Sequence, residues 1–225
     1  RTNVEIGNTG TSSPHRIVGY YGGWSIYKRL FSIKNIQTAN YTHILYAFFG
    51  ISLSNHQLIS LDPWADFHDK TLNSSITDAR KPSEAPGNMN DLYRLKQSNS
   101  PIKVGISIGG ETASSAFPAM VATKENRTTF ISSLCCLVRN YGLDLVDIDW
   151  EYPTSDQEGK NFVALLSEMH NVFQQVSPNV EISIAIGASQ EAMQFVYVKS
   201  MLQYVGFFNL MAYPYGGFFL NTVEH

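Results

Sequence analysis

The sequence predicts an α/β fold with one parallel β-sheet, and two observations indicate it. Short apolar and β-branched segments alternate along the chain with longer segments in which apolar residues recur at helical spacing. Strands that alternate with helices form right-handed βαβ units, which place the strands parallel in one sheet. The composition agrees, because 225 residues that are 44% hydrophobic and 16% charged are enough for one sizeable core.

Six strands and four helices are predicted in chain order. The strands are predicted at residues 16–21, 43–50, 102–108, 144–150, 181–187 and 206–213. The helices are predicted at residues 89–97, 127–141, 159–176 and 190–204. Residues 54–87 are rich in Asp, Ser, Asn and Pro, a composition that predicts a long loop. No linker or short repeat interrupts this order, so a single domain is expected.

The strand at 144–150 carries the most informative pattern of the chain. Successive side chains of a strand face opposite ways, so Asp147, Asp149 and Glu151 share one face. A parallel sheet is normally covered on both faces, where neighbouring carboxylates repel one another and are costly to desolvate. Such acids are typical of sites where one holds a proton while a neighbour stays charged. Pro153 ends the strand just beyond Glu151, at the end where α/β barrels place their chemistry.

Two other interpretations of the acidic strand remain open at this point. Alternating acidic and apolar residues also suit an edge strand with a solvated face, although helical segments on both sides disfavour it. Grouped Asp and Glu also suit Mg²⁺ or Ca²⁺. No histidine or further acidic run near the motif supports a metal, so we expect no metal and no cofactor.

The pattern Asp144-x-x-Asp147-x-Asp149-x-Glu151 resembles the signature of glycoside hydrolase family 18, the chitinases and their lectin-like relatives. Further segments resemble the family's strands in the right order. These segments, each with the residues that match the family's motifs, are 16–27 with Tyr20, 41–49 with Phe48, 103–110 with Ser107, Gly109 and Gly110, and 209–213 with Met211 and Tyr213.

The resemblance implies a TIM (β/α)8-type barrel, apparently truncated after the sixth strand. A closed barrel has eight strands, and residues 218–225 do not form a complete further unit. Residues 1–225 would then be a single catalytic-type barrel domain that lacks the last two βα units. Unpaired edges of such a sheet favour self-association.

The resemblance also implies hydrolysis of β-1,4 N-acetylglucosamine linkages in chitin or chito-oligosaccharides. The mechanism would be retaining and substrate-assisted, with endo-type cleavage. Glu151 would protonate the glycosidic oxygen, Asp149 would orient the substrate's acetamido group, and Asp147 would share a proton with Asp149. Tyr213 would donate its hydroxyl to the acetamido oxygen. The residues expected to bind substrate are Tyr20, Phe48, Met211 and Glu111, and those expected to support the site are Asp144, Ser107, Gly109 and Gly110.

Two positions depart from the family pattern. Many chitinases have Trp where this chain has Glu111, and the family usually has Asp where this chain has Pro214. The first change removes a stacking platform and adds a charge, and the second removes a polar group close to the acid. A non-hydrolytic chitin-binding relative or an inactive fragment is therefore the alternative, while the presence of Glu151 favours an enzyme.

Charge and short motifs limit partners and location. A net charge of −3 and a pI of about 6.1 point neither to nucleic acid nor to an anionic membrane surface. No apolar run approaches the roughly 20 residues that span a bilayer. The triplets at Asn40, Asn73 and Asn126 fit the N-glycosylation pattern. Proteins of the family that this chain resembles are usually secreted, so the resemblance implies a secreted glycoprotein. The adjacent Cys135 and Cys136 are expected to be free thiols, and Trp24 and Trp150 are expected to be structural.

Overall fold

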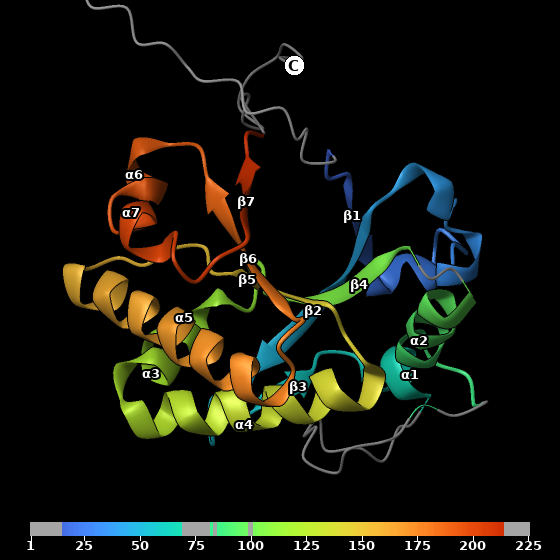
Figure 1. Ribbon diagram of the computed structural model, residues 1–225, viewed down its shortest axis with the longest axis horizontal. Coiled ribbons are helices and arrows are strands. Elements are labelled where there is room, and N and C mark those ends of the chain that lie inside the picture. The colour runs from blue at the N-terminus through green and yellow to red at the C-terminus, as the bar shows by residue number, and fades with distance from the viewer. Residues whose placement is uncertain (1–14, 69–81, 83–84, 99–100, 214–225) are drawn as a thin grey trace, which may run out of the picture.

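The computed structural model describes residues 15–68, 82, 85–98 and 101–213. Six parallel strands form a curved, open sheet in the order β1-β2-β4-β5-β6-β7, with the helices on its outer side (Figure 1). The strands are β1 (Val18–Gly22), β2 (His43–Ile51), β4 (Lys103–Gly109), β5 (Leu145–Asp149), β6 (Glu181–Gly187) and β7 (Phe207–Met211). The predicted α/β fold and all six predicted strands are confirmed. The sheet has the form of an incomplete TIM-type barrel.

The helices connect consecutive parallel strands, as the alternating pattern predicts. The α-helices are α1 (Pro63–Phe67), α2 (Asn88–Ser98), α3 (Phe117–Ala122), α4 (Lys124–Tyr141), α5 (Asp156–Val176), α6 (Gln190–Met193) and α7 (Val198–Met201). The 3-10 turns are η1 (Gly23–Ile26), η2 (Ile33–Asn35), η3 (Thr38–Asn40) and η4 (Ser114–Ala116). The two long helices start at side-chain caps, since Thr123 accepts from the Asn126 amide and Ser155 from the Glu158 amide.

Two predicted segments are wrong in detail. The stretch 54–87, predicted as a loop, contains strand β3 (Leu58–Ser60), antiparallel to β2, and helix α1, while residues 69–81 and 83–84 lie outside the description. The helix predicted at 190–204 is two short helices, α6 and α7. The chain between them lies against α5, where a Cβ on Gly159 would overlap the carbonyl oxygen of Phe195.

The core lies between the outer face of the sheet and the helices. Ile106, Val146, Ile148 and Ile184 are fully buried there, on strands β4 to β6. The apolar stripe of α5, predicted to be core, is buried as Phe162, Leu165, Leu166, Met169 and Phe173. The outer face of the sheet is therefore apolar, and the polar side chains of the strands lie on its inner face.

Other expectations concern single residues and the membrane. Cys135 and Cys136 are free, as predicted. Trp150 is buried as predicted, with its ring 5.3 Å from that of Phe117 and 5.4 Å from that of Phe162. None of the helices in the described ranges is long and apolar enough to cross a membrane. Asn73, Pro214 and residues 218–225 lie outside the described residues.

Candidate active site

The alternation of β5 sends its acids to the inner face of the sheet. Val146 and Ile148 pack outward under the helices, while Asp147 and Asp149 face inward. Asp147 lies level with Ser107 on β4 and Ser183 on β6. Asp147 and Asp149 therefore share one face, which lies inside the curvature of the sheet rather than on a solvated edge.

Asp147 is fully buried and accepts four hydrogen bonds from four other strands. The donors are the Tyr20 hydroxyl at 2.9 Å, the Ser107 hydroxyl at 2.7 Å, the Ser183 hydroxyl at 2.6 Å and the Asn209 amide at 3.2 Å. Burial raises the pKa of Asp147, and the hydrogen bonds oppose that rise. Ser107 is one of the residues expected to support the site, whereas the sequence analysis missed Ser183 and Asn209.

Asp149 lies one pleat further along β5 and has a different environment. Its residue is only 4% exposed, and its Oδ1 atom is buried without a hydrogen-bond partner among the described residues. Burial, followed by the charges of Glu151 and Asp147, raises the pKa of Asp149 to about 7. A buried acceptor without a hydrogen bond destabilises the folded state, so we expect a donor from a bound ligand at this atom.

Glu151 lies two residues beyond the end of β5, held by its neighbours. Its backbone N–H donates to the Ser114 hydroxyl at 2.8 Å. Burial raises the pKa of Glu151, and the Glu111 carboxylate raises it further. Hydrogen bonds from the Tyr152 hydroxyl and the Glu111 backbone lower it. Glu151 thus combines the proton-holding environment of a general acid with partial access to solvent.

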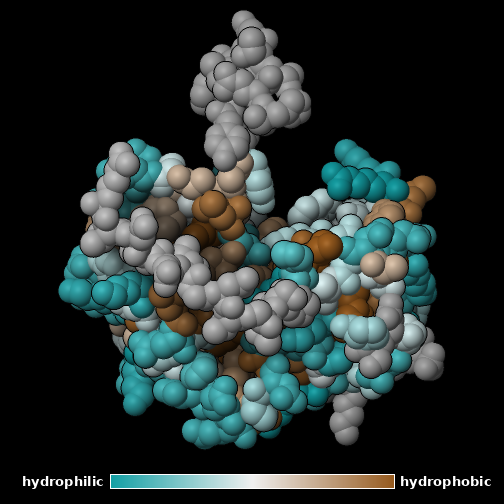
Figure 2. Space-filling view, turned by 45° about the horizontal axis from the view of Figure 1, so that its top comes forward, coloured by the Kyte–Doolittle hydropathy of each residue, from teal (hydrophilic) through white to brown (hydrophobic). Residues whose placement is uncertain are grey.

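A cavity of about 510 Å³ opens over the inner face of the sheet, with Asp149 in its wall. The face that carries β1 and β7 is turned toward the viewer in Figure 2, where it is hollowed between two lobes with apolar side chains beside the hollow. Among the predicted site residues, the cavity brings together Tyr20, Phe48, Asp149, Met211 and Tyr213. Tyr213 is 72% exposed and is the last residue that the structure describes.

Aromatic side chains form the part of the cavity wall that follows β1 and β2. The β2–β4 register shifts between Ala47 and Phe49, and the bulged residue Phe48 lines the cavity. Trp24 stacks on Phe48 with ring centroids 6.1 Å apart and is 54% exposed. The expectation that Trp24 is structural is therefore wrong. No local pattern predicts this position, because it depends on the turn η1 that directly follows β1.

Three of the residues expected to support the site, Gly109, Gly110 and Asp144, have clear structural positions. A Cβ on Gly109, where φ is +116°, would overlap the Asp149 carbonyl oxygen, and one on Gly110, where φ is +77°, would crowd the Phe48 ring at 3.0 Å. Asp144 lies at the other end of β5, where it accepts from the Val104 amide at 3.0 Å and pairs with Lys96 at 2.8 Å. Asp144 thus tethers the strand and lies away from the cavity.

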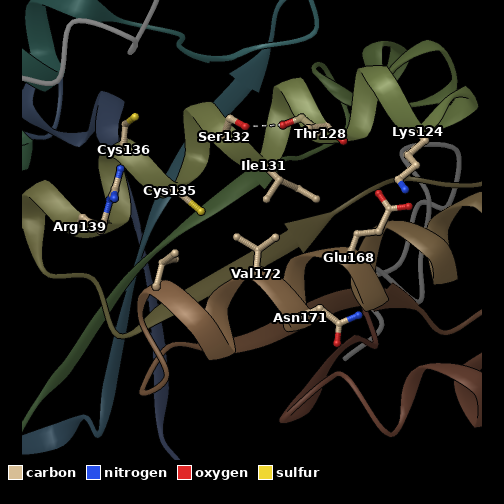
Figure 3. Close-up of a pocket in the computed structure, with 11 residues that line it drawn as sticks. Lys124, Thr128, Ile131, Ser132, Cys135, Cys136, Arg139, Glu168, Asn171 and Val172 are labelled. Atoms are coloured by element: carbon tan, nitrogen blue, oxygen red, sulfur yellow. Dashed lines mark hydrogen bonds between the residues drawn. The ribbon is translucent and has the colours of Figure 1, made fainter.

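A second cavity of about 490 Å³ holds none of Asp147, Asp149 and Glu151. It is a groove between α4 and α5, into which Ile131, Cys135 and Val172 point (Figure 3). The Arg127–Glu168 ion pair joins the two helices at 2.7 Å. In the described ranges, no group of three or more His, Cys, Asp or Glu residues is arranged to hold a metal ion.

Comparisons with known proteins agree with this geometry. The family described as "Glycosyl hydrolases family 18" matches residues 16–225. The chain is 29% identical over 233 residues to Endochitinase 1 of Metarhizium anisopliae, covering 96% of this chain and 54% of the relative. It is 32% identical over 215 residues to Chitinase 1 of Aphanocladium album, covering 92% and 49%.

Solved structures give the same picture for the fold. The Group IV chitinase of Ostrinia furnacalis superposes with a TM-score of 0.75 at 28% identity, covering 88% of this chain and 51% of that one. The chain therefore spans about half the length of the curated relatives and the solved structure that it matches.

Proposed function

Because the chain belongs to family 18 of the glycosyl hydrolases, we propose that it hydrolyses β-1,4 linkages between N-acetylglucosamine units of chitin or chito-oligosaccharides. The observation that carries this proposal is the buried, unpartnered Oδ1 of Asp149 in the wall of the cavity. An amide N–H of the substrate is the donor that this atom lacks. The second support is Glu151, an acid of raised pKa two residues further along the chain.

In the proposed reaction, Glu151 gives its proton to the glycosidic oxygen while the acetamido carbonyl oxygen of the substrate attacks the anomeric carbon. The glycosidic bond breaks, the leaving sugar departs with the proton, and a cyclic oxazolinium ion remains. Glu151 then takes a proton from water as the water attacks the same carbon. The ring reopens, and the anomeric configuration is retained.

The other residues act on the acetamido group. Asp149 accepts the acetamido N–H and balances the positive charge of the oxazolinium ion. Asp147 accepts all four of its hydrogen bonds, an arrangement that suits a carboxylate. Its charge favours a proton on Asp149 before substrate binds. That proton passes to Asp147 when Asp149 accepts the acetamido N–H, so Asp149 is an anion when the oxazolinium ion forms. Tyr213 donates to the acetamido oxygen, and Met211 packs beneath the sugar ring.

Binding without turnover is the second candidate, and the exposure of Tyr213 favours it. Tyr213 is 72% exposed, so its hydroxyl would hold the acetamido oxygen in place less well than a buried hydroxyl would. In this alternative, the chain would bind chitin in the same cavity without cleaving it. Secretion and glycosylation remain part of the proposal, since both fit a substrate found outside cells.

One experiment tests the proposal and separates the two candidates. Chito-oligosaccharides and cello-oligosaccharides of equal length are incubated with the chain, and the products and binding are measured. The hydrolase hypothesis expects cleavage of the acetamido-bearing series alone, with the β-anomer released first. Binding of that series without cleavage would support the second candidate, and efficient cleavage of cello-oligosaccharides would contradict substrate assistance.

A further inference from the structure

Glu111 lies beside the proposed general acid. Gly109 on β4 pairs with Asp149 on β5, and both strands end at these residues. The Gly110 N–H donates to the Asp149 carbonyl oxygen, so the segments that lead to Glu111 and Glu151 leave the sheet side by side. Glu111 is exposed, and its carboxylate makes no ion pair with another described residue. Its charge acts on Glu151, and its backbone hydrogen-bonds the Glu151 carboxyl group. An unneutralised negative charge therefore lies beside the bond that would be cleaved.

The backbone around Glu111 is held in place. The Gly110 N–H donates to the Asp149 carbonyl oxygen at 2.8 Å, and the Ser114 hydroxyl donates to the Gly110 carbonyl oxygen at 2.9 Å. The same hydroxyl accepts the Glu151 N–H. Ser114 thus ties the backbone segment that carries Glu111 to the backbone segment that carries Glu151.

Two independent observations indicate that a ligand occupies this end of the sheet. Oδ1 of Asp149 is buried and unpartnered, and the cavity that it lines has exposed aromatic rings. The cavity also has one cation in its wall, Arg29. Arg29 follows η1 on the β1 side, whereas Glu111 follows β4, and β2 lies between those strands. Among the described residues, neither Arg29 nor Glu111 forms an ion pair.

We propose that Glu111 makes the cleft selective for partially deacetylated chitin, in which a sugar unit beside Glu111 carries a free amine. This inference rests on the proposed function and names its substrate class more narrowly. An ammonium group placed against an unpaired carboxylate gains a charge-assisted contact that an acetamido group cannot make. The unit over Asp149 must keep its acetamido group for the chemistry, so the amine lies on a neighbouring unit.

The test compares two oligosaccharide series of equal length, one fully acetylated and one partially deacetylated. The measured quantity is the ratio of kcat/KM for the second series to that for the first, at mildly acidic pH. Variants are Glu111→Gln, Glu111→Lys and the control Glu125→Gln, which removes an exposed carboxylate from the first turn of α4. We expect the ratio to fall about threefold to fivefold in Glu111→Gln, further in Glu111→Lys, and not at all in the control.

Salt and binding measurements complete the test. Raising the ionic strength from about 0.1 M to about 1 M should lower the ratio for the unmodified chain, because exposed charges are screened. Calorimetric titration with a glucosamine oligosaccharide, which is not cleaved, should show weaker binding by Glu111→Gln than by Glu125→Gln.

The outcomes separate the two proposals. Cleavage of the fully acetylated series with an unchanged ratio in Glu111→Gln would overturn the role of Glu111 and leave the proposed function standing. If neither series is cleaved, the proposed hydrolysis fails. The titration then decides alone, and equal binding of the glucosamine oligosaccharide by Glu111→Gln and Glu125→Gln would overturn the selectivity.

Discussion

The Tyr20 hydroxyl on β1 donates a 2.9 Å hydrogen bond to Oδ2 of Asp147 on β5. The two strands are separated in the sheet by β2 and β4, so this bond spans the inside of its curvature. Tyr20 thus lines the cavity with its ring and holds the most buried acid with its hydroxyl. The bond therefore connects Tyr20, in the wall of the proposed substrate cavity, to the buried carboxyl group of Asp147.

Tyr20→Phe is expected to destabilise the chain more than Tyr21→Phe. The Tyr20 hydroxyl donates to a carboxyl group, whereas the Tyr21 hydroxyl donates to the Phe31 carbonyl oxygen, also at 2.9 Å. Hydrogen bonds to charged groups contribute about 1.5–3 kcal/mol and neutral ones about 0.5–1.5 kcal/mol. Urea unfolding of both variants at neutral pH measures the difference. Equal losses would indicate that Asp147 carries no charge in the folded chain.

The pH dependence of hydrolysis should respond to Glu111. Glu151 must be protonated to act, so the rate falls as the pH rises through the pKa of Glu151. The Glu111 carboxylate raises that pKa, after the larger effect of burial. Glu111→Gln should therefore move the basic limb of the kcat/KM profile to lower pH, and Glu125→Gln should leave it in place. A basic limb that stays fixed in Glu111→Gln would show that another group sets it.

Stability should fall between about pH 4 and pH 7 because of Asp66. This carboxyl group is 1% exposed and accepts hydrogen bonds from Tyr46 and Ser60. Burial raises the pKa of Asp66 to about 7 from a model-compound value of 3.8. The folded chain therefore holds the proton after the unfolded chain has lost it, and stability is lost as the pH rises toward 7.

Asp66→Asn should reduce that dependence. A difference of about three pKa units corresponds to a loss of up to about 4 kcal/mol. Urea unfolding across this pH range measures the slope for the chain and the variant. Asp149 has a raised pKa of about 7 and adds a slope of the same sign, so the variant should retain a smaller one. An unchanged slope in Asp66→Asn would contradict the buried, protonated state of Asp66.

The isolated 225-residue chain is expected to self-associate. In the described structure β1 and β7 are the two ends of the sheet, and each pairs on one side alone. Ile17 beside β1 is 53% exposed, and Leu210 on β7 is 58% exposed. Unpaired edges with apolar side chains recruit further strands. Light scattering over a range of concentrations measures the association, and a monodisperse monomer would contradict it.

The sequence predicted the elements whose pattern is local. The six parallel strands follow from apolar, β-branched runs, and α5 follows from its apolar spacing. Strand β3 was missed because three residues in a polar stretch become a strand only through pairing with β2. The helix predicted at 190–204 is broken where Phe195 packs against Gly159, a contact with an element 36 residues away that no local pattern contains.

The same distinction applies to the site. The acids of β5 were predicted because alternation within one strand places them on one face. Ser183 and Asn209 were missed although each is a polar residue at an inward position of a mostly apolar strand, a signal that strand alternation could have supplied. The role of Trp24 could not be predicted, because it depends on the turn η1 and on the bulge at Phe48.

The central claim is that Glu151 is the general acid, and Glu151→Gln tests it most directly. The account predicts a loss of about 10²-fold or more in kcat/KM on a chito-oligosaccharide, with oligosaccharide affinity retained and with Glu125→Gln as active as the unmodified chain. Turnover by Glu151→Gln equal to that of the unmodified chain would contradict it.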